Sequence, residues 1–253
     1  MSDLIRLKNL VTDAMNAILV EHDRAKVRGY FHGDFVQHNP WSADGSAHVE
    51  AMCDFSFGVK MNRWAIQGDI VAYHGLYTAP NPLGEHPLLC VDLWRVQGEQ
   101  IVEHWDALQP MPAEVAELMI AGAGDGLAEV APSRVAANAA RARRLFELGV
   151  NKADRELITS LLAASFTVHR PKVTDGREAF TSWAASSRPS IAVKRTVASG
   201  DLVFAQLLVE IAGAEQVVYE ILRFNDDGRI TDQWTVAQDR VPLSEAANPH
   251  PHF

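Results

Sequence analysis

Three side chains that could transfer protons stand close together in a part of the sequence that is typical of β-strands. His104 and Asp106 flank Trp105, and because alternate side chains of a strand share a face, the two project together. If the turn at residues 97–99 takes three residues, Asp92 of the preceding strand lies opposite His104 on the same face. Burial raises the pKa of a carboxyl group and a neighbouring imidazolium lowers it, so such a trio can move protons near neutral pH.

Two alternatives to this cluster stay open. A two-residue turn would move Asp92 to the other face of the sheet. The pattern also fits an exposed hairpin with ordinary alternation of charged residues. In the three-residue register Cys90 lies opposite Asp106, so the pairing of the two strands decides whether the trio forms.

The chain contains an internal repeat, and only one copy keeps these groups. Residues 23–45 align without gaps on residues 154–176 at an offset of 131, with seven identities, where about one or two are expected from ordinary residue usage. The pairs are Asp23/Asp154, Arg24/Arg155, Phe35/Phe166, His38/His169, Pro40/Pro171, Asp44/Asp175 and Gly45/Gly176. Further on, Trp105 is matched by Trp234, whereas Asp92, His104 and Asp106 are replaced by Glu220, Gln233 and Thr235. A packing requirement keeps the tryptophan, and an acid/base site lost from one copy explains the rest.

The repeat divides the chain into two expected domains. Residues 1–127 carry the candidate site and residues 128–253 form the degenerate copy, with a flexible joint at residues 121–126. With 47% hydrophobic and 22% charged residues the chain can build ordinary cores. Residues 246–253, which include two prolines and two histidines, are expected to form a loose solvated tail.

Charge and composition exclude several classes of partner. A net charge of −9 without a basic run argues against nucleic acid and against an anionic membrane surface. No apolar run approaches the roughly 20 residues of a spanning helix, and the start lacks the basic and apolar segments of a signal peptide. Two cysteines, Cys53 and Cys90, favour two buried thiols in a reduced, cytoplasmic setting.

The order of hydrophobic patterns predicts an α+β fold. Apolar residues between Leu4 and Leu19 recur at helical spacing, and Asp154 is placed to cap a short helix that follows it. The remaining segments of each copy are rich in β-forming residues and are separated by turn residues. The expected strands are Ile70–His74, Leu88–Val96, Ile101–Leu108, Leu202–Ile211, Val217–Phe224 and Ile230–Ala237. Helices first and a meander of antiparallel strands afterwards is typical of the α+β class.

Other chemistry finds less support in the sequence. His38 recurs as His169 in the degenerate copy, which favours a structural hydrogen-bonding role over a catalytic one without excluding the latter. Metal-binding motifs, a glycine-rich phosphate loop and a Gly-x-Ser-x-Gly elbow are absent from the sequence. We therefore expect no metal site and no cofactor.

Four short segments together resemble a known family. They are Phe35-Val36-Gln37-His38-Asn39-Pro40, Gly68-Asp69-Ile70-Val71, Asp92-Leu93-Trp94-Arg95 and the run from Ile101 to Gln109. In combination they resemble the SnoaL-like branch of the nuclear-transport-factor-2-like superfamily across nearly all of the first copy, and more weakly in the second. The resemblance implies a cone-shaped α+β domain in which a strongly curved antiparallel sheet surrounds a pocket closed by helices. Because members commonly pair their sheets as dimers, it also implies a pseudo-dimer within one chain, with further self-association left open.

The resemblance also assigns roles to residues. In the polyketide cyclases of this branch an aspartate on the last strand acts as acid/base, and Asp106 occupies that position. Asp92 stands where those cyclases have a histidine, so a polycyclic aromatic substrate is not implied. The first hypothesis is a cofactor-independent cyclase, isomerase or lyase that acts by proton transfer on a small, largely apolar carbonyl compound. Asp106 would abstract a proton, and His104 or Asp92 would stabilise or reprotonate the enolate.

The remaining candidates complete this hypothesis and its alternatives. His38 is the fourth catalytic candidate, and the expected substrate-binding residues are Trp64, Trp94, Asn39 and Leu108. The alternatives are a non-catalytic protein that binds a hydrophobic small molecule and a purely structural module. A closed pocket with Asp106 at its floor favours the enzyme, and an exposed Asp106 favours the other two.

Overall fold

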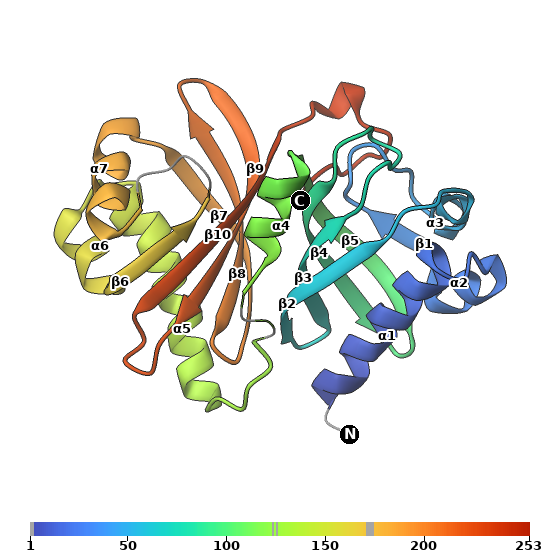
Figure 1. The fold of residues 1–253 in the computed structure, drawn as a ribbon, viewed down its shortest axis with the longest axis horizontal. Coiled ribbons are helices and arrows are strands. Elements are labelled where there is room, and N and C mark those ends of the chain that lie inside the picture. Colours follow the sequence, from blue (N-terminus) through green and yellow to red (C-terminus); the bar gives the residue numbers. More distant parts are fainter. Residues whose placement is uncertain (1–2, 123, 125, 171–174) are drawn as a thin grey trace. The chain divides into compact units, whose positions relative to one another are not determined.

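The computed structural model describes residues 3–122, 124, 126–170 and 175–253, which form two compact units (Figure 1). The first unit consists of Met1–Gly124 together with Val241–Phe253, and the second of Asp125–Arg240. Among the described residues, no helix is long and apolar enough to cross a membrane.

The main elements follow the same order in both units: two helices, a strand, a further helix and four strands. Those of the first unit are α1 (Asp3–Leu19), α2 (Arg24–Tyr30), β1 (Phe31–Gln37), α3 (Ser46–Ala51), the 3-10 helix η1 (Met52–Asp54), β2 (Val59–Gln67), β3 (Ile70–Tyr77), β4 (Leu88–Gln97), β5 (Gln100–Pro110) and α4 (Ala113–Ile120). Those from Asp125 onward are α5 (Pro132–Arg144), the π-helix η2 (Leu145–Val150), α6 (Arg155–Leu161), β6 (Leu162–His169), α7 (Arg177–Ser187), β7 (Ser190–Ser199), β8 (Leu202–Ile211), β9 (Ala214–Phe224), β10 (Ile230–Asp239) and η3 (Leu243–Glu245). The last of these, η3, lies in the C-terminal segment that joins the first unit.

The two sheets have the same topology, which confirms the α+β class and the duplication. Their strand orders are β1-β5-β4-β3-β2 and β6-β10-β9-β8-β7. In each sheet the first strand runs parallel to its neighbour, and the other pairs are antiparallel. Because sequential strands joined by short turns pair as hairpins, β2 to β5 and β7 to β10 form two meanders.

The side chains shared by the two copies cap helices, fill the cores and form ion pairs. Asp23 and Asp154 accept backbone N–H bonds at the starts of α2 and α6, as caps. Phe35 and Phe166 are buried in the two cores. Arg24 and Arg155 form ion pairs with Asp54 and Glu178.

The turn that leads into α3 or α7 is also shared. Asp44 and Asp175 each accept the backbone N–H of the residue seven positions earlier, and Gly45 and Gly176 have φ of 89° and 95°, a conformation that favours glycine. Pro171, the partner of Pro40, lies outside the described residues. The fold thus accounts for the residues that the two copies share. It does not account for Asp92, His104 and Asp106, which are replaced in the second copy.

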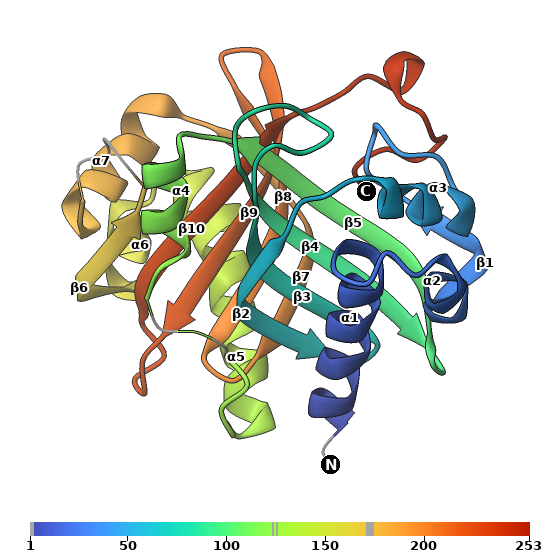
Figure 2. The ribbon, with the colours of Figure 1, turned by 45° about the vertical axis from the view of Figure 1, so that its right-hand side comes forward.

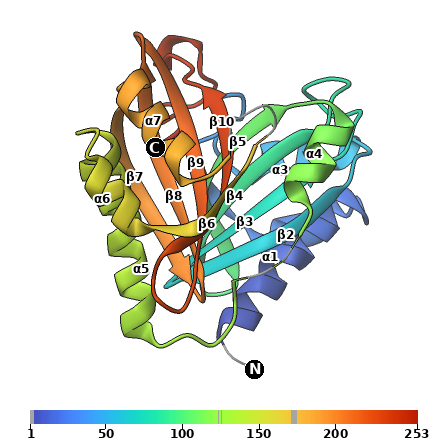
Figure 3. The ribbon, with the colours of Figure 1, turned by 60° about the vertical axis from the view of Figure 1, so that its left-hand side comes forward.

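Helices cover one face of each sheet. Figure 2 shows α1 running across the sheet of the first unit, and its apolar stripe, from Leu7 to Leu19, is buried as the helical spacing predicted. Figure 3 shows α5, α6 and α7 on one face of the other sheet. There Phe146, Ile158, Phe166 and Phe180 contribute to a continuous apolar core.

The C-terminal segment corrects an expectation from the sequence. We expected residues 246–253 to form a loose tail of the second domain, but Val241–Phe253 groups with the first unit. Asn248 and His252 are buried, and backbone N–H groups of Ala247 and His252 donate to the carbonyls of Pro40 and His38. The segment is ordered because it satisfies backbone acceptors that a loop would otherwise leave to water.

Candidate functional site

The candidate residues lie in one row across the sheet of the first unit. Trp64 pairs with Tyr73, Tyr73 with Asp92, and Asp92 with Asp106, so all four side chains project from the same face. His104 pairs with Trp94 in the adjacent row and shares this face. Strand alternation therefore brings Asp92, His104 and Asp106 together.

The pairing that produces this row differs from the one expected. Gln97 pairs with Gln100 across a two-residue turn, so the three-residue turn was wrong. Asp92 lies opposite Asp106 rather than His104, and Cys90 lies opposite Leu108 rather than Asp106. The register shifts again between Val96 and Arg95, because β5 holds one extra residue there as a β-bulge. The bulge restores the alternation that the shorter turn would have reversed.

The trio is buried and closely packed. Asp92, His104 and Asp106 are 1%, 5% and 3% exposed. Nε2 of His104 lies 3.0 Å from Oδ1 of Asp92, and the Trp94 ring stacks on the imidazole with ring centres 3.7 Å apart. Oδ2 of Asp92 and Oδ1 of Asp106 have no hydrogen-bond partner within the protein. Both are buried acceptors whose hydrogen-bonding capacity the protein leaves unused.

The loop after β1 orients both the imidazole and the carboxyl group. Oδ1 of Asn39 accepts the backbone N–H of Trp41 at 2.9 Å, which turns Nδ2 of Asn39 toward Oδ2 of Asp106, 2.6 Å away. Oε1 of Gln37 accepts the backbone N–H of Asn39 at 2.9 Å and lies 2.9 Å from Nδ1 of His104. Because a backbone N–H can only donate, both amide orientations are fixed.

These contacts determine the tautomer of His104. Its Nδ1 faces an acceptor oxygen, so Nδ1 carries a proton, and Nε2 shares a second proton with Asp92. Tyr77 donates its hydroxyl to the same Asp92 oxygen at 3.1 Å, and Tyr73 lies 2.9 Å from the Tyr77 hydroxyl. Burial raises the pKa of both tyrosines well above the usual value, so they remain donors at neutral pH.

We expect ¹⁵N spectra of histidine-labelled protein to show Nδ1 of His104 protonated at pH 8, with His104→Asn identifying the resonance. The physical reason is that only a protonated Nδ1 can bond to Oε1 of Gln37. Gln37→Leu removes this acceptor and should abolish the preference. A wild-type spectrum in which Nδ1 lacks a proton would contradict the assignment.

The surroundings of Asp106 raise the pKa of its carboxyl group toward neutrality. Burial raises its pKa to about 6, and Asp92 adds to the rise, whereas His104 and the Asn39 hydrogen bond oppose it. A carboxyl group with such a pKa is ionised for part of the time and a stronger base than an exposed aspartate. This is the property required of a general base.

The trio faces a cavity of about 340 Å³. Helix α1, residues around α3 and the 78–88 turn contribute mostly apolar walls, with polar groups gathered at the sheet. The lining residues include Met15, Ile18, Trp41, Val49, Phe55, Phe57, Tyr77, Leu83, Asp92, Trp94, His104, Asp106 and Leu108. An apolar cavity with a few convergent polar groups is the usual form of a small-molecule site.

Most of the predicted site residues meet at this cavity, but two do not. Trp94, Asn39 and Leu108 line it together with the trio. Trp64 lies further along the row, where Nζ of Lys8 in α1 lies 5.2 Å from the centre of its ring, and it is not among the residues that line the cavity. Gln37 and Tyr77 were not predicted from the sequence, although the spacing of Tyr73 and Tyr77 in one strand places both on the face of the trio.

His38 lies outside the cavity. Its Nε2 is 2.8 Å from Glu103 and its ring stacks on Trp105, both on the opposite face of β5 from the trio. His169 repeats this arrangement, 2.8 Å from Asp232 and stacked on Trp234. The shared histidine therefore ties the first strand to the last in each sheet, as the structural alternative predicted.

The same trio has the composition of a metal site. One ligand atom each from Asp92, His104 and Asp106 lies within 4.8 Å of the others, so these residues are the ones that could hold a divalent cation. The bond between Nε2 of His104 and Asp92 uses the atoms that such a cation would need. A cation would thus compete with the shared proton.

The second copy keeps a polar cluster at the equivalent position. Oε2 of Glu220 accepts hydrogen bonds from Gln233 at 2.8 Å and Thr235 at 2.9 Å. Burial raises the pKa of Glu220 to about 7. The three side chains therefore converge as their counterparts do, but only one of them is ionisable, which removes the acid/base pair.

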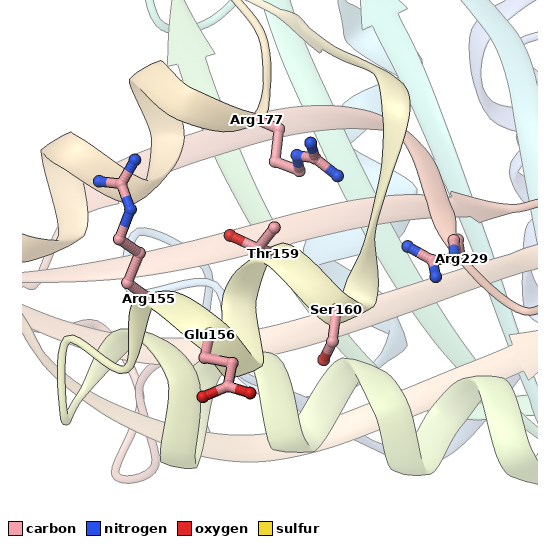
Figure 4. A pocket seen from close by; sticks show the side chains of 6 residues that line it. All are labelled: Arg155, Glu156, Thr159, Ser160, Arg177 and Arg229. Carbon is pink, nitrogen blue, oxygen red and sulfur yellow. The ribbon is translucent and has the colours of Figure 1, made fainter.

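A surface hollow in the second unit is differently built (Figure 4). It has a volume of about 550 Å³, and its lining residues are Arg155, Glu156, Thr159, Ser160, Arg177 and Arg229. None of these side chains is buried, and Arg155 is paired with Glu178. Without a desolvated polar group it offers no chemistry comparable to that of the trio.

Comparisons with known proteins bear on the second copy most directly. Residues 142–233 match the SnoaL-like domain family. The resemblance seen in the sequence is thereby confirmed, although the match falls on the copy that lacks counterparts of the same type for Asp92, His104 and Asp106. A sequence comparison with curated proteins found no significant match. The SnoaL-like match thus rests on residues that build the fold.

Solved structures are similar to parts of the chain at low sequence identity. A protein from Kribbella flavida provisionally named a ketosteroid isomerase is 18% identical, with a TM-score of 0.38, covering 43% of this chain and 82% of its own. A protein from Bacillus cereus provisionally named a polyketide cyclase is 18% identical, with a TM-score of 0.38, covering 43% and 79%. An NTF2-like protein of unknown function from Burkholderia xenovorans is 13% identical, with a TM-score of 0.39, covering 43% and 88%.

Proposed function

We propose that the chain is a cofactor-independent enzyme of the cyclase or isomerase kind, which transfers protons on a small, largely apolar carbonyl compound in the cavity of the first copy. The second copy is its degenerate, non-catalytic partner domain. One observation carries the proposal. Asp106, buried and with a pKa of about 6, presents an unpartnered oxygen beside a histidine and a second aspartate in an apolar cavity.

The chemistry follows from the contacts of each group. Oδ1 of ionised Asp106 takes a proton from the carbon next to the carbonyl, and the electron pair moves onto the carbonyl oxygen to give an enolate. That oxygen replaces Oδ1 of Asp92 as the acceptor of the proton on Nε2 of His104, while the Tyr77 hydroxyl continues to donate to Asp92. Asp106 then returns its proton to another carbon in an isomerisation, or the enolate carbon forms a new bond in a cyclisation.

The charge of the cavity defines the substrate further. Among the described residues that line it, none is lysine or arginine, and two are aspartates. A carboxylate or phosphate on the substrate would meet like charge in a region of low dielectric constant without a compensating cation. The substrate class that fits is an uncharged carbonyl compound, held by Trp94 and Leu108 and oriented by Asn39.

Deuterium exchange tests the proposal without knowledge of the natural substrate. We expect the protein to accelerate exchange of the protons next to the carbonyl of neutral cyclic ketones in D₂O, followed by ¹H NMR. A carboxylate-bearing analogue of each ketone should exchange no faster than in buffer, and a chelator should leave the rate unchanged. Binding of neutral ketones without any exchange would replace the enzyme with the alternative, a protein that only binds hydrophobic small molecules.

A further inference from the structure

The chain passes through the second copy and then returns to the first. After β10, Val241–Phe253 groups with the first unit, and its contacts there concentrate on the loop that follows β1. Nδ2 of Asn248 donates to the carbonyls of Asn39 at 2.6 Å and Ser42 at 3.0 Å. This amide is 5% exposed, so both hydrogen bonds are shielded from water.

Backbone groups of the same segment extend these contacts along the loop. The N–H of Ala247 donates to the carbonyl of Pro40 and the N–H of His252 to that of His38, each at 2.7 Å. Nδ1 of His38 lies 2.6 Å from the carbonyl of His250. Every carbonyl from His38 to Pro40 therefore accepts a hydrogen bond from the segment, which replaces solvent as the partner of this loop.

The loop held in this way carries two residues of the site. The Asn39 side chain donates to Oδ2 of Asp106, and Gln37 faces Nδ1 of His104. Because Asn39 contributes its carbonyl to Asn248 and its amide to Asp106, a displacement of the Asn39 backbone also displaces its amide. The C-terminal segment and the carboxyl group are thus connected through one residue.

We propose that Asn248 is a positioning residue, which holds the Asn39 amide against Asp106 so that a segment following the second copy completes the site of the first. The inference rests on the proposed function only for its catalytic consequence, because the state of Asp106 can be measured without a substrate. It also gives the second copy a part in the site, since that copy delivers the segment that follows it in the chain.

Titration of Asp106 tests the proposal. Aspartate labelled with ¹³C at the carboxyl carbon, with Asp106→Asn to identify the resonance, follows its ionisation in the intact chain. In Asn248→Ala we expect the pKa of Asp106 to rise, because the Asn39 hydrogen bond that favours its charged form weakens. The groups that face Asp106, Asp92 and His104, are unchanged. Hydrogen exchange at the loop amides should accelerate about tenfold, the effect of losing roughly 1.4 kcal/mol of hydrogen bonding.

Two further variants distinguish positioning from a general loss of structure. Ala247→Pro removes only the N–H donor to Pro40, and Ala246, at φ −81° and ψ 147°, is in the extended conformation that a following proline requires. It should shift the titration in the same direction. Leu243→Ala, at an exposed position of the same segment, should leave both the titration and the exchange unchanged.

A double variant decides whether the effect passes through Asn39. Asn39→Ala should raise the pKa of Asp106 by itself, and adding Asn248→Ala to it should cause no further rise. The proposal is overturned if loop exchange accelerates in Asn248→Ala while Asp106 titrates as in wild type. It is also overturned if the two substitutions shift the titration additively. Neither result would affect the deuterium-exchange test of the enzyme.

Discussion

Asp106→Asn is expected to lower the exchange or turnover rate about 10²-fold to 10⁴-fold, the usual cost of losing a general base. The asparagine has nearly the same shape, and its carbonyl oxygen can still accept the 2.6 Å hydrogen bond from Asn39. Affinity for a neutral ligand should therefore change little. Rates and dissociation constants measured on the same ketone check both parts.

Wild-type activity should rise with pH through about 6. Asp106 is inactive as a base while it is protonated, and burial places its pKa at about 6, so the rate is low below that value and approaches a plateau above it. Thr235→Val, at the equivalent position of the second copy, should leave this profile unchanged. Equal rates for wild type and Asp106→Asn would remove Asp106 from the mechanism and leave the binding protein as the better account.

The sequence predicted the composition of the site better than its geometry. Alternation along β5 placed His104 and Asp106 on one face, and this needs no knowledge of the partner strand. The position of Asp92 depended on the hairpin, where the two-residue turn and the bulge each displace the register by one residue in the same direction. Together they move the partner of Asp92 from His104 to Asp106 and leave its side chain on the expected face. The side chains of residues 96–102 do not show clearly enough either that the turn has two residues or that β5 contains a bulge.

Other features of the site could not be predicted from side-chain patterns. Trp64 was expected to bind substrate, but no local pattern predicted that Lys8 of α1 would lie over its ring. The C-terminal segment binds backbone carbonyls of the loop after β1, and backbone carbonyls are present whatever the sequence. Its prolines and histidines therefore did not predict that the segment would be ordered. The fold was more accessible, because capping aspartates, turn glycines and strand periodicity are local signals that occur twice in this chain.

Glu220→Gln is expected to stabilise the second unit at alkaline pH. Burial raises the pKa of Glu220 to about 7, against an ordinary value near 4.3 in the unfolded chain. Above pH 7 the folded protein must hold a buried charge, whereas below about 4 the group is neutral in both states. Stability therefore falls as pH rises between these values, by an amount on the order of 4 kcal/mol at most, since each pKa unit corresponds to about 1.4 kcal/mol.

Glutamine removes the charge and keeps an oxygen for Gln233 and Thr235, which donate to Oε2 of Glu220. The melting temperature of the variant should exceed that of wild type at pH 8 and approach it at pH 5. Glu129→Gln, at an exposed position of the same unit, is the matched control and should show no such difference. If Glu220→Gln lowers the melting temperature equally at both pH values, the carboxylate is instead stabilised in the fold by its two donors. Glu220 would then be a carboxylate that stabilises the second copy, and not a neutral carboxyl group left over from an acid/base site.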